Sequence, residues 1–263
     1  MDINVLISNP DFFSELTGMD RISGIYLEQE RLTADRLRKM VKTAREHGKK
    51  LYLALPYIWN EESARALKKE IAPIAGAQPD GFLVRNLDEL GLLYDRGIQG
   101  EIILDAGLYT FNRRSAELLG RAGGTRFTAP YELNRRELEQ RGFEKTELTV
   151  YGHYPMMISS GCLRLTTGKC VREKEPYGVY RLKDRTGTIF PAVNCCRYCY
   201  NIIYNSVPTW LLDEDGIEEA ESLRFCFTVE SRLEMRSVLT RFFDGEREPK
   251  GSITRGHYKR GVQ

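Results

Sequence analysis

The stretch Leu223-Arg-Phe-Cys-Phe-Thr-Val229, with the helical pattern from Ser231 to Phe243 that follows it, decides the fold class of this chain. Its apolar and β-branched residues predict a buried strand. Seven runs of the same kind occur earlier in the chain, and most are followed by an amphipathic stretch of helical period. Together they make eight strand–helix units, which is the number that a closed (β/α)8 barrel requires.

The earlier units are regularly spaced. The seven predicted strands are Ile3–Ile7, Ser23–Leu27, Lys50–Leu55, Asp80–Val84, Glu101–Leu104, Thr125–Ala129 and Glu147–Tyr151. The predicted helices between them are Thr33–His47, Glu61–Ile74, Leu87–Tyr94, Ser115–Arg121 and Arg135–Arg141. This alternation predicts an α/β fold with a parallel sheet, closed as a TIM-like (β/α)8 barrel. A doubly wound open sheet is the competing fold, because a count of strands does not show closure.

Length and composition exclude several classes of protein. The chain has 263 residues, of which 41% are hydrophobic and 29% charged, and its net charge is only +2. These values are typical of a globular protein and exclude a disordered chain. No apolar stretch approaches the roughly 18 residues of a membrane span, and residues 1–5 lack the features of a signal peptide. We therefore expect a cytoplasmic protein whose cysteines are reduced.

The pattern divides the chain into three parts. Residues 1–155 hold the first seven strand–helix units, residues 156–222 form an insert, and residues 223–263 hold the eighth unit and a basic tail. The insert contains a predicted β-hairpin, Val179–Lys183 and Thr188–Val193. It leaves the carboxyl end of strand seven, on the face where barrel enzymes carry their chemistry.

The insert holds five of the six cysteines, all between residues 162 and 199. The candidate ligands are Cys162, Cys170, Cys196 and Cys199. Four thiolates suit a tetrahedral zinc ion or an iron–sulfur cluster. Seven residues separate Cys162 from Cys170, which is more than in the usual zinc knuckle. This spacing favours a cluster. A redox pair or packing cysteines are the alternatives. Spacing does not decide between Cys195 and Cys196. Cys226 is expected in the core, with cluster ligation as the alternative.

The insert is also basic, since residues 156–212 hold eight Lys or Arg against three acids, a balance of +5. Interleaved aromatic residues would suit stacked bases and phosphates. The same charges could equally compensate an anionic cluster, and the same aromatic residues could form the insert's own core.

Polar side chains at the carboxyl ends of the predicted strands mark the expected substrate pocket. They are Arg85, Asp105, Glu132, His153, Tyr154 and Glu230. Asn86 fits this site or a helix cap equally well. The tail adds Arg255, His257 and Arg260, with Gly256 and Gly261 to bend the chain. We predict that the tail folds back over the cluster side of the barrel and binds carboxylate or phosphate. A disordered basic tail is the alternative.

Several stretches resemble one known family. They are Tyr151–Cys162, Thr166–Cys170, Asn194–Ser206 and Thr254–Val262. On these residues the chain resembles the U32 peptidase family, also called collagenase-like. Val84–Leu90 and Ala129–Asn134 resemble the second, C-terminal barrel of its long members. Two positions depart from the family pattern: His153 lies where an arginine is more usual, and Cys195 is an additional thiol.

The resemblance implies a [4Fe–4S] cluster held by four cysteines. It also implies either peptidase activity or oxygen-independent hydroxylation of a tRNA base, a ribosomal RNA base or a ubiquinone precursor. For the RNA-modifying relatives it implies prephenate, a small anionic co-substrate, as the source of the hydroxyl group. An N-terminal U32 domain or a partner subunit is a further implied partner.

The motifs of known peptidase classes help to choose between these activities. The sequence contains neither an H-E-x-x-H zinc motif nor a G-x-S-x-G elbow, and it has only three histidines. A cysteine nucleophile with His153 or His257 as base would compete with ligation for the same thiols. We therefore expect cluster-dependent modification of an RNA base. A peptidase and a non-catalytic cluster-binding subunit are the alternatives.

Overall fold

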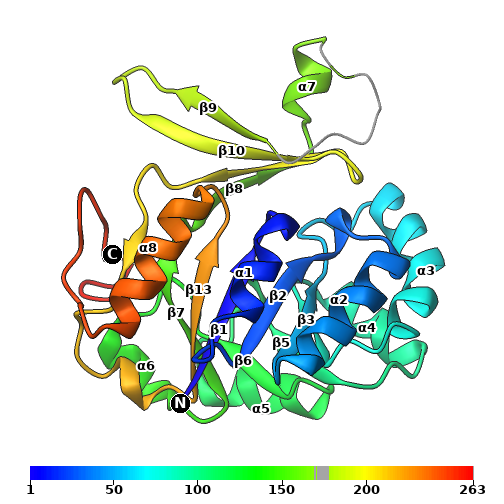
Figure 1. Ribbon diagram of the computed structural model, residues 1–263, viewed down its shortest axis with the longest axis horizontal. Coiled ribbons are helices and arrows are strands. Elements are labelled where there is room, and N and C mark those ends of the chain that lie inside the picture. The colour runs from blue at the N-terminus through cyan, green and yellow to red at the C-terminus, as the bar shows by residue number, and fades with distance from the viewer. Residues whose placement is uncertain (169, 171–177, 263) are drawn as a thin grey trace.

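The structure, a computed structural model, describes residues 1–168, 170 and 178–262. Eight strands of the described chain form a closed parallel barrel, shown in Figure 1. They are β1 (Asp2–Ile7), β2 (Gly24–Glu28), β3 (Lys50–Ala54), β4 (Gly81–Val84), β5 (Glu101–Leu104), β6 (Arg126–Thr128), β7 (Thr146–Gly152) and β13 (Ser222–Phe227). Each strand pairs in parallel with the next, and β13 lies between β7 and β1. The predicted barrel is therefore confirmed, and the open sheet is excluded.

Helices surround the barrel. They are α1 (Phe13–Thr17), α2 (Ala34–Glu46), α3 (Glu61–Ala75), α4 (Leu87–Asp95), α5 (Arg113–Arg121), α6 (Arg135–Arg141) and α8 (Arg232–Phe243). Side chains at the N-caps fix where several of them begin, since each accepts a hydrogen bond from the backbone three residues on. These caps are Asn60, Asn86, Asn112, Asn134 and Ser231. Asn86 is thus the cap of α4.

The insert forms a second, antiparallel sheet above the barrel mouth (Figure 1). Its strands, in spatial order, are β8 (Pro155–Ser159), β11 (Tyr200–Tyr204), β10 (Ile189–Cys195) and β9 (Val179–Lys183). A short helix α7 (Leu163–Thr166) follows β8, and β12 (Thr209–Trp210) pairs with the end of β7. Residues 169 and 171–177, part of the expected basic and aromatic run, lie outside the described residues.

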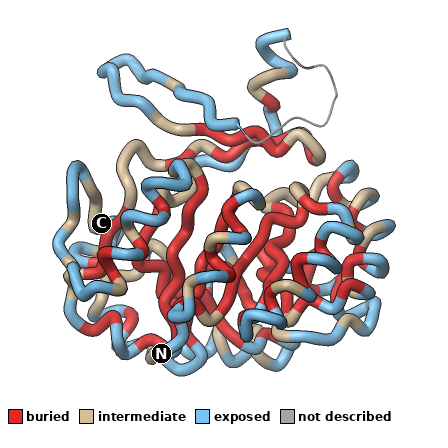
Figure 2. Tube along the Cα trace, in the orientation of Figure 1, coloured by how far each residue is buried: buried red, intermediate tan, exposed pale blue. Residues whose placement is uncertain are grey.

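The hydrophobic core has three parts. The largest lies between the strands and the helices, and a second fills the barrel interior with Tyr26, Tyr52 and Cys226 among its members. A third lies beneath the insert sheet, where Tyr198, Tyr200 and neighbouring side chains pack on the barrel. Figure 2 shows these buried segments against the exposed outer part of the insert. Cys226 therefore packs inside the barrel, as expected.

The contact between β7 and β13 depends on one glycine. Gly152 has φ of +140°, and a Cβ atom there would lie 2.5 Å from the carbonyl oxygen of Cys226. A side chain would therefore push apart the strands that precede and follow the insert. None of the described helices is both long and apolar enough to cross a membrane.

Candidate functional site

A chain of buried charges crosses the barrel. The two terminal nitrogens of Arg85 donate to the Glu28 carboxylate at 2.7 and 2.9 Å, and its Nε donates to Asp105 at 3.2 Å. The other Asp105 oxygen accepts from Arg224 at 3.0 Å, and Arg224 Nε donates to Glu147 at 2.6 Å. All five side chains are buried. Three carboxylates thus face two guanidinium groups.

Arg85 and Asp105, which were predicted to line the substrate pocket, both belong to this network. Burial alone would raise the pKa of Asp105, but the guanidinium groups of Arg224 and Arg85 outweigh it and lower that pKa. Arg85 also lies over the Tyr57 ring, 3.7 Å from its centroid. Arg85 and Asp105 are therefore engaged with each other and with the barrel.

The insert sheet gathers cysteines at one turn. Cys195 pairs with Tyr200 where β10 meets β11, so residues 196–199 form the turn between these strands. Cys199 adopts a left-handed conformation with φ of +53°. Cys162 follows β8, whose partner is β11. Three of the four predicted ligand cysteines thus lie at the same end of the insert sheet.

One side chain ties the Cys162 segment to this turn. Asn201 on β11 accepts a hydrogen bond from the backbone of Leu163 at 3.1 Å and donates to the carbonyl oxygen of Gly161. Its side chain is almost fully buried. Asn201 therefore fixes the backbone on both sides of Cys162. Asn201 was not predicted from the sequence, although its place in the Cys-Tyr-Asn stretch is a signal that could have revealed it.

The adjacent thiols of Cys195 and Cys196 have different surroundings. Burial raises the pKa of Cys195, and the Glu30 carboxylate raises it further. Burial also raises the pKa of Cys196, followed by the effect of the Cys162 thiol, while Arg31 and Arg164 oppose the rise. Neighbouring residues at the end of a strand point in opposite directions. Cys195 therefore packs in the core beneath the insert sheet, whereas Cys196 is half-buried and feels the charge of the Cys162 thiol.

The cysteine turn contacts the loop after β2 and helix α3. Arg31, in the 3-10 helix η2 (Gln29–Arg31), donates to the carbonyl oxygen of Asn194 at 2.8 Å. Tyr198 hydrogen-bonds Gln29, and Arg197 pairs with Glu70. These contacts hold the cysteine turn over one side of the barrel mouth.

His153 and Glu230 follow adjacent strands, β7 and β13. His153 Nδ1 lies 2.6 Å from the carbonyl oxygen of Asn205, so that nitrogen carries a proton. Glu230 accepts hydrogen bonds from the backbone of Thr228 and Val229 at 2.9 and 3.0 Å. Burial raises the pKa of Glu230, and His153 lowers it. The two side chains therefore influence each other at the carboxyl end of the barrel.

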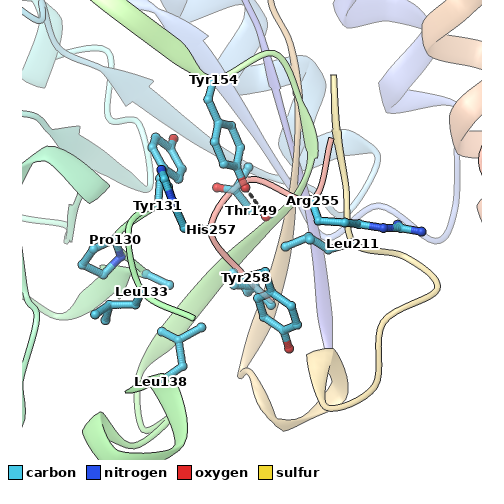
Figure 3. A pocket seen from close by; sticks show the side chains of 12 residues that line it. Pro130, Tyr131, Leu133, Leu138, Thr149, Tyr154, Leu211, Arg255, His257 and Tyr258 are labelled. Carbon is cyan, nitrogen blue, oxygen red and sulfur yellow. Dashed lines mark hydrogen bonds between the residues drawn. The ribbon is translucent and has the colours of Figure 1, made fainter. Parts of the chain in front are cut away.

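A pocket opens beside β6 and β7, as Figure 3 shows. Its wall includes Tyr131 and Tyr154, whose rings stack with centroids 3.9 Å apart. The tail contributes Arg255, His257 and Tyr258. Of the predicted substrate residues, the pocket thus brings together Tyr154, Arg255 and His257. Tyr131 is a lining residue that was not predicted from the sequence.

The tail returns to the barrel, but its contacts are with α6 and with the segment after the insert sheet. Thr254 bridges to Thr209, and Tyr258 accepts a backbone hydrogen bond from Arg135 at 2.8 Å. Arg255 pairs with Asp213 and, at 3.0 Å, with Glu214. These are internal partners for a guanidinium group that we expected to bind an external anion.

Neither the pocket nor the buried charge network includes the remaining predicted residues. Glu132 is half-buried in the loop between β6 and α6, and Arg260 is exposed near the end of the tail. Cys170 is half-buried. Within the part of the chain that the structure describes, no three His, Cys, Asp or Glu side chains are close enough together to hold a metal ion.

Comparison with solved structures supports the barrel. The U32 peptidase Mk0906 superposes with a TM-score of 0.54 at 12% identity, covering 88% of this chain and 94% of its own. An HpcH/HpaI aldolase from Desulfitobacterium hafniense DCB-2 gives a TM-score of 0.39 at 9% identity, covering 95% of this chain and 94% of its own. At 12% identity, the likeness to Mk0906 shows the fold alone.

Sequence comparison gives the family. No curated protein matches this chain. The sequence profile of peptidase family U32 matches residues 23–176, which is more than half of the chain and includes two of the insert's cysteines. The chain therefore belongs to peptidase family U32.

Proposed function

We propose that this chain holds a [4Fe–4S] cluster and acts in the oxygen-independent hydroxylation of an RNA base. The observation that carries the proposal is the arrangement at the cysteine turn. Cys196 and Cys199 share that turn, and Cys162 is held beside it by Asn201. Cys195, the additional thiol, packs in the core beneath the insert sheet.

The chemistry of the donor set fits such a group. Cys162, Cys170, Cys196 and Cys199 would supply four thiolates, the usual ligands of this cluster, and the cluster would supply electron transfer. A thiolate-held cluster is anionic, and the guanidinium groups of Arg31 and Arg164 act on the Cys196 thiol. These two arginines would therefore lower the cost of gathering negative charge at the turn. A structural zinc ion is the alternative occupant of the same ligands.

Peptide hydrolysis, which the family name suggests, is the second candidate. It needs a nucleophile within hydrogen-bond reach of a base. The Nδ1 atom of each histidine contacts a backbone carbonyl oxygen, that of Thr43 for His47, of Asn205 for His153 and of Gly261 for His257, which leaves Nε2 as the atom that would act as a base. Within the described residues, no cysteine or serine side chain is paired with a histidine. This observation favours modification over hydrolysis.

The test is an anaerobic reconstitution. Protein purified without oxygen should be brown and hold about four irons. Incubated with a reductant, prephenate and RNA from cells lacking this gene, it should add one oxygen to a nucleoside, detected by mass spectrometry. A chain that needs a partner subunit or an N-terminal U32 domain would show this activity only after that partner is added.

The matched control is Cys226→Ser, which changes a thiol of the barrel interior. It should keep iron and activity, whereas Cys199→Ser should lose both. Colourless protein with one tightly bound zinc would contradict the cluster. Cleavage of collagen-like peptides by iron-free protein would restore the peptidase assignment.

A further inference from the structure

The hairpin made by β9 and the first half of β10 projects from the barrel (Figure 1). Ala192 and Val193, at its base, are buried. Beyond them every residue from 179 to 191 is exposed or half-buried, as Figure 2 shows. We call residues 179–191 the outer hairpin. A segment of this kind contributes little to the core, so its sequence is free to serve another purpose.

The strand register sorts the side chains of the outer hairpin onto two faces. Lys183 pairs with Ile189 and Arg181 with Pro191, so the two cations follow each other on one face. Residues two apart along a strand are separated by about 6.6 Å. Tyr180, on the other face, is 37% exposed. One side of the outer hairpin thus presents a row of positive charge, and the other presents an aromatic ring.

The cations of the outer hairpin are not neutralised. Some cations elsewhere on the surface pair with carboxylates, as Arg38 does with Asp35 and Arg65 with Glu61. In the described parts of the chain, no carboxylate lies within 4.0 Å of Arg181, Lys183 or Arg185.

The one acid of the outer hairpin serves the turn instead. Asp184 accepts hydrogen bonds from the backbone of Thr186 at 2.8 Å and of Thr188 at 2.9 Å. The outer hairpin therefore carries a balance of three positive charges to one negative, with the negative charge directed into its own turn.

We propose that the outer hairpin is the surface that binds the phosphate backbone of the RNA. This inference rests on the proposed function, because it takes RNA as the partner. Cations without a carboxylate partner are available to bind a polyanion. Each contact with a phosphate then releases a counterion, which favours binding. The exposed Tyr180, on the opposite face of the same hairpin, offers a stacking surface for a base.

The position of the outer hairpin suits this role. Strand β10 runs from Ile189 at the hairpin to Cys195 at the cysteine turn, a span of roughly 20 Å. RNA held on the outer hairpin therefore lies at one end of a strand whose other end carries the cysteines. An RNA segment of several nucleotides can contact both ends.

The experiment compares two triple variants of the full chain, purified without oxygen. The first is Arg181→Gln with Lys183→Gln and Arg185→Gln. The matched control is Arg113→Gln with Arg114→Gln and Arg121→Gln, which removes the same charge from exposed positions on α5. Binding of a fluorescein-labelled oligouridylate is measured by anisotropy across a range of salt concentrations. Circular dichroism and iron content verify that both variants are folded.

The hairpin variant should bind at least about tenfold more weakly at moderate salt, and its salt slope should fall by about 2, as expected when three phosphate contacts are lost. The control should stay within about twofold of the parent. Equal losses in both variants, or no loss in either, would overturn the inference.

Two further outcomes separate this inference from the proposed function. If the parent binds RNA and the hairpin variant binds equally well, the hairpin inference alone fails. If the parent protein binds no RNA, both the hairpin inference and the RNA part of the proposed function fail. Vesicles rich in phosphatidylserine serve as a second probe. Loss of vesicle binding with RNA binding intact would assign the hairpin to a membrane surface and overturn the inference.

Discussion

Arg85 holds the carboxylate of Glu28 through two parallel hydrogen bonds of 2.7 and 2.9 Å, although 57 positions separate them in sequence. Both side chains are buried. A paired buried charge becomes costly when its partner is removed, because the remaining charge keeps its desolvation penalty. The pair therefore makes the barrel sensitive to single substitutions.

We predict that Arg85→Met lowers the free energy of unfolding by about 3–5 kcal/mol. The variant leaves Glu28 unpaired and removes one of the two guanidinium partners of Asp105. Urea denaturation measures the loss. Arg38→Met, whose partner Asp35 is exposed, is the control and should cost less than about 1 kcal/mol. Equal effects of the two substitutions would contradict a structural role for the network.

The two adjacent cysteines should behave differently. Cys196→Ser should lose the iron, because its thiol feels the charge of the Cys162 thiol. Cys195→Ser should keep it, because that thiol is directed toward Glu30. Iron and sulfide analysis of anaerobically purified protein gives the answer. Retention of iron by the Cys196 variant together with its loss from the Cys195 variant would reverse the ligand assignment.

Asn201 should act as a positioning residue for the Cys162 segment. Asn201→Ala removes the hydrogen bonds to Leu163 and Gly161 and should destabilise that segment by about 1–3 kcal/mol. Asn201→Asp keeps the acceptor for Leu163 and should restore part of the loss. Hydrogen exchange of the amides of residues 161–167 and the rate of iron release report the effect. Unchanged exchange in the Ala variant would show that the clamp is unimportant.

The barrel strands could be predicted because local sequence determines them. Their apolar runs recur regularly, and N-cap residues such as Asn60 and Asn134 mark where the helices begin. Strands β8 and β11 were missed for a physical reason. Pro155–Ser159 is mostly exposed, and it is a strand because it pairs with Tyr200–Tyr204. Pairing between distant segments leaves no periodic signal in either one.

The site was predictable only in part for a similar reason. The sequence indicates that Arg85 and Asp105 lie at strand ends, but not that each already has a buried partner. Arg224 lies within the apolar run of the last strand and binds Glu147, 77 positions away. The cysteines were easier to find, because their chemistry is tied to residue type and spacing. The orientation of Cys195 and Cys196 needed the strand register.

Glu89 should make stability depend on pH. Burial raises its pKa to about 8 from an ordinary value of 4.5, although hydrogen bonds such as that from the Arg85 backbone oppose the rise. The folded state thus binds this proton more tightly than the unfolded state does. Its contribution to stability is full below about pH 4.5 and is lost as the pH rises through 8.

Glu89→Gln keeps an acceptor for the Arg85 N–H and removes the titrating charge. The variant should gain stability relative to the parent as the pH rises, by about 1–3 kcal/mol at pH 8. Denaturation curves between pH 5 and 9 measure the difference. Glu117→Gln, at an exposed position on α5, is the control. A difference that does not change with pH would contradict the buried, protonated state of Glu89.

Arg255 should stabilise the tail rather than bind substrate. Its guanidinium pairs with Asp213 and Glu214 and donates to the carbonyl oxygen of Trp210 at 2.5 Å. Arg255→Ala leaves two acids without this partner, so we expect a loss of about 1–3 kcal/mol in stability. Arg260→Ala changes an exposed residue of the same tail and should cost less than about 0.5 kcal/mol. If Arg255→Ala leaves the unfolding transition unchanged but raises KM for an anionic substrate, Arg255 is a binding residue and the structural role is wrong.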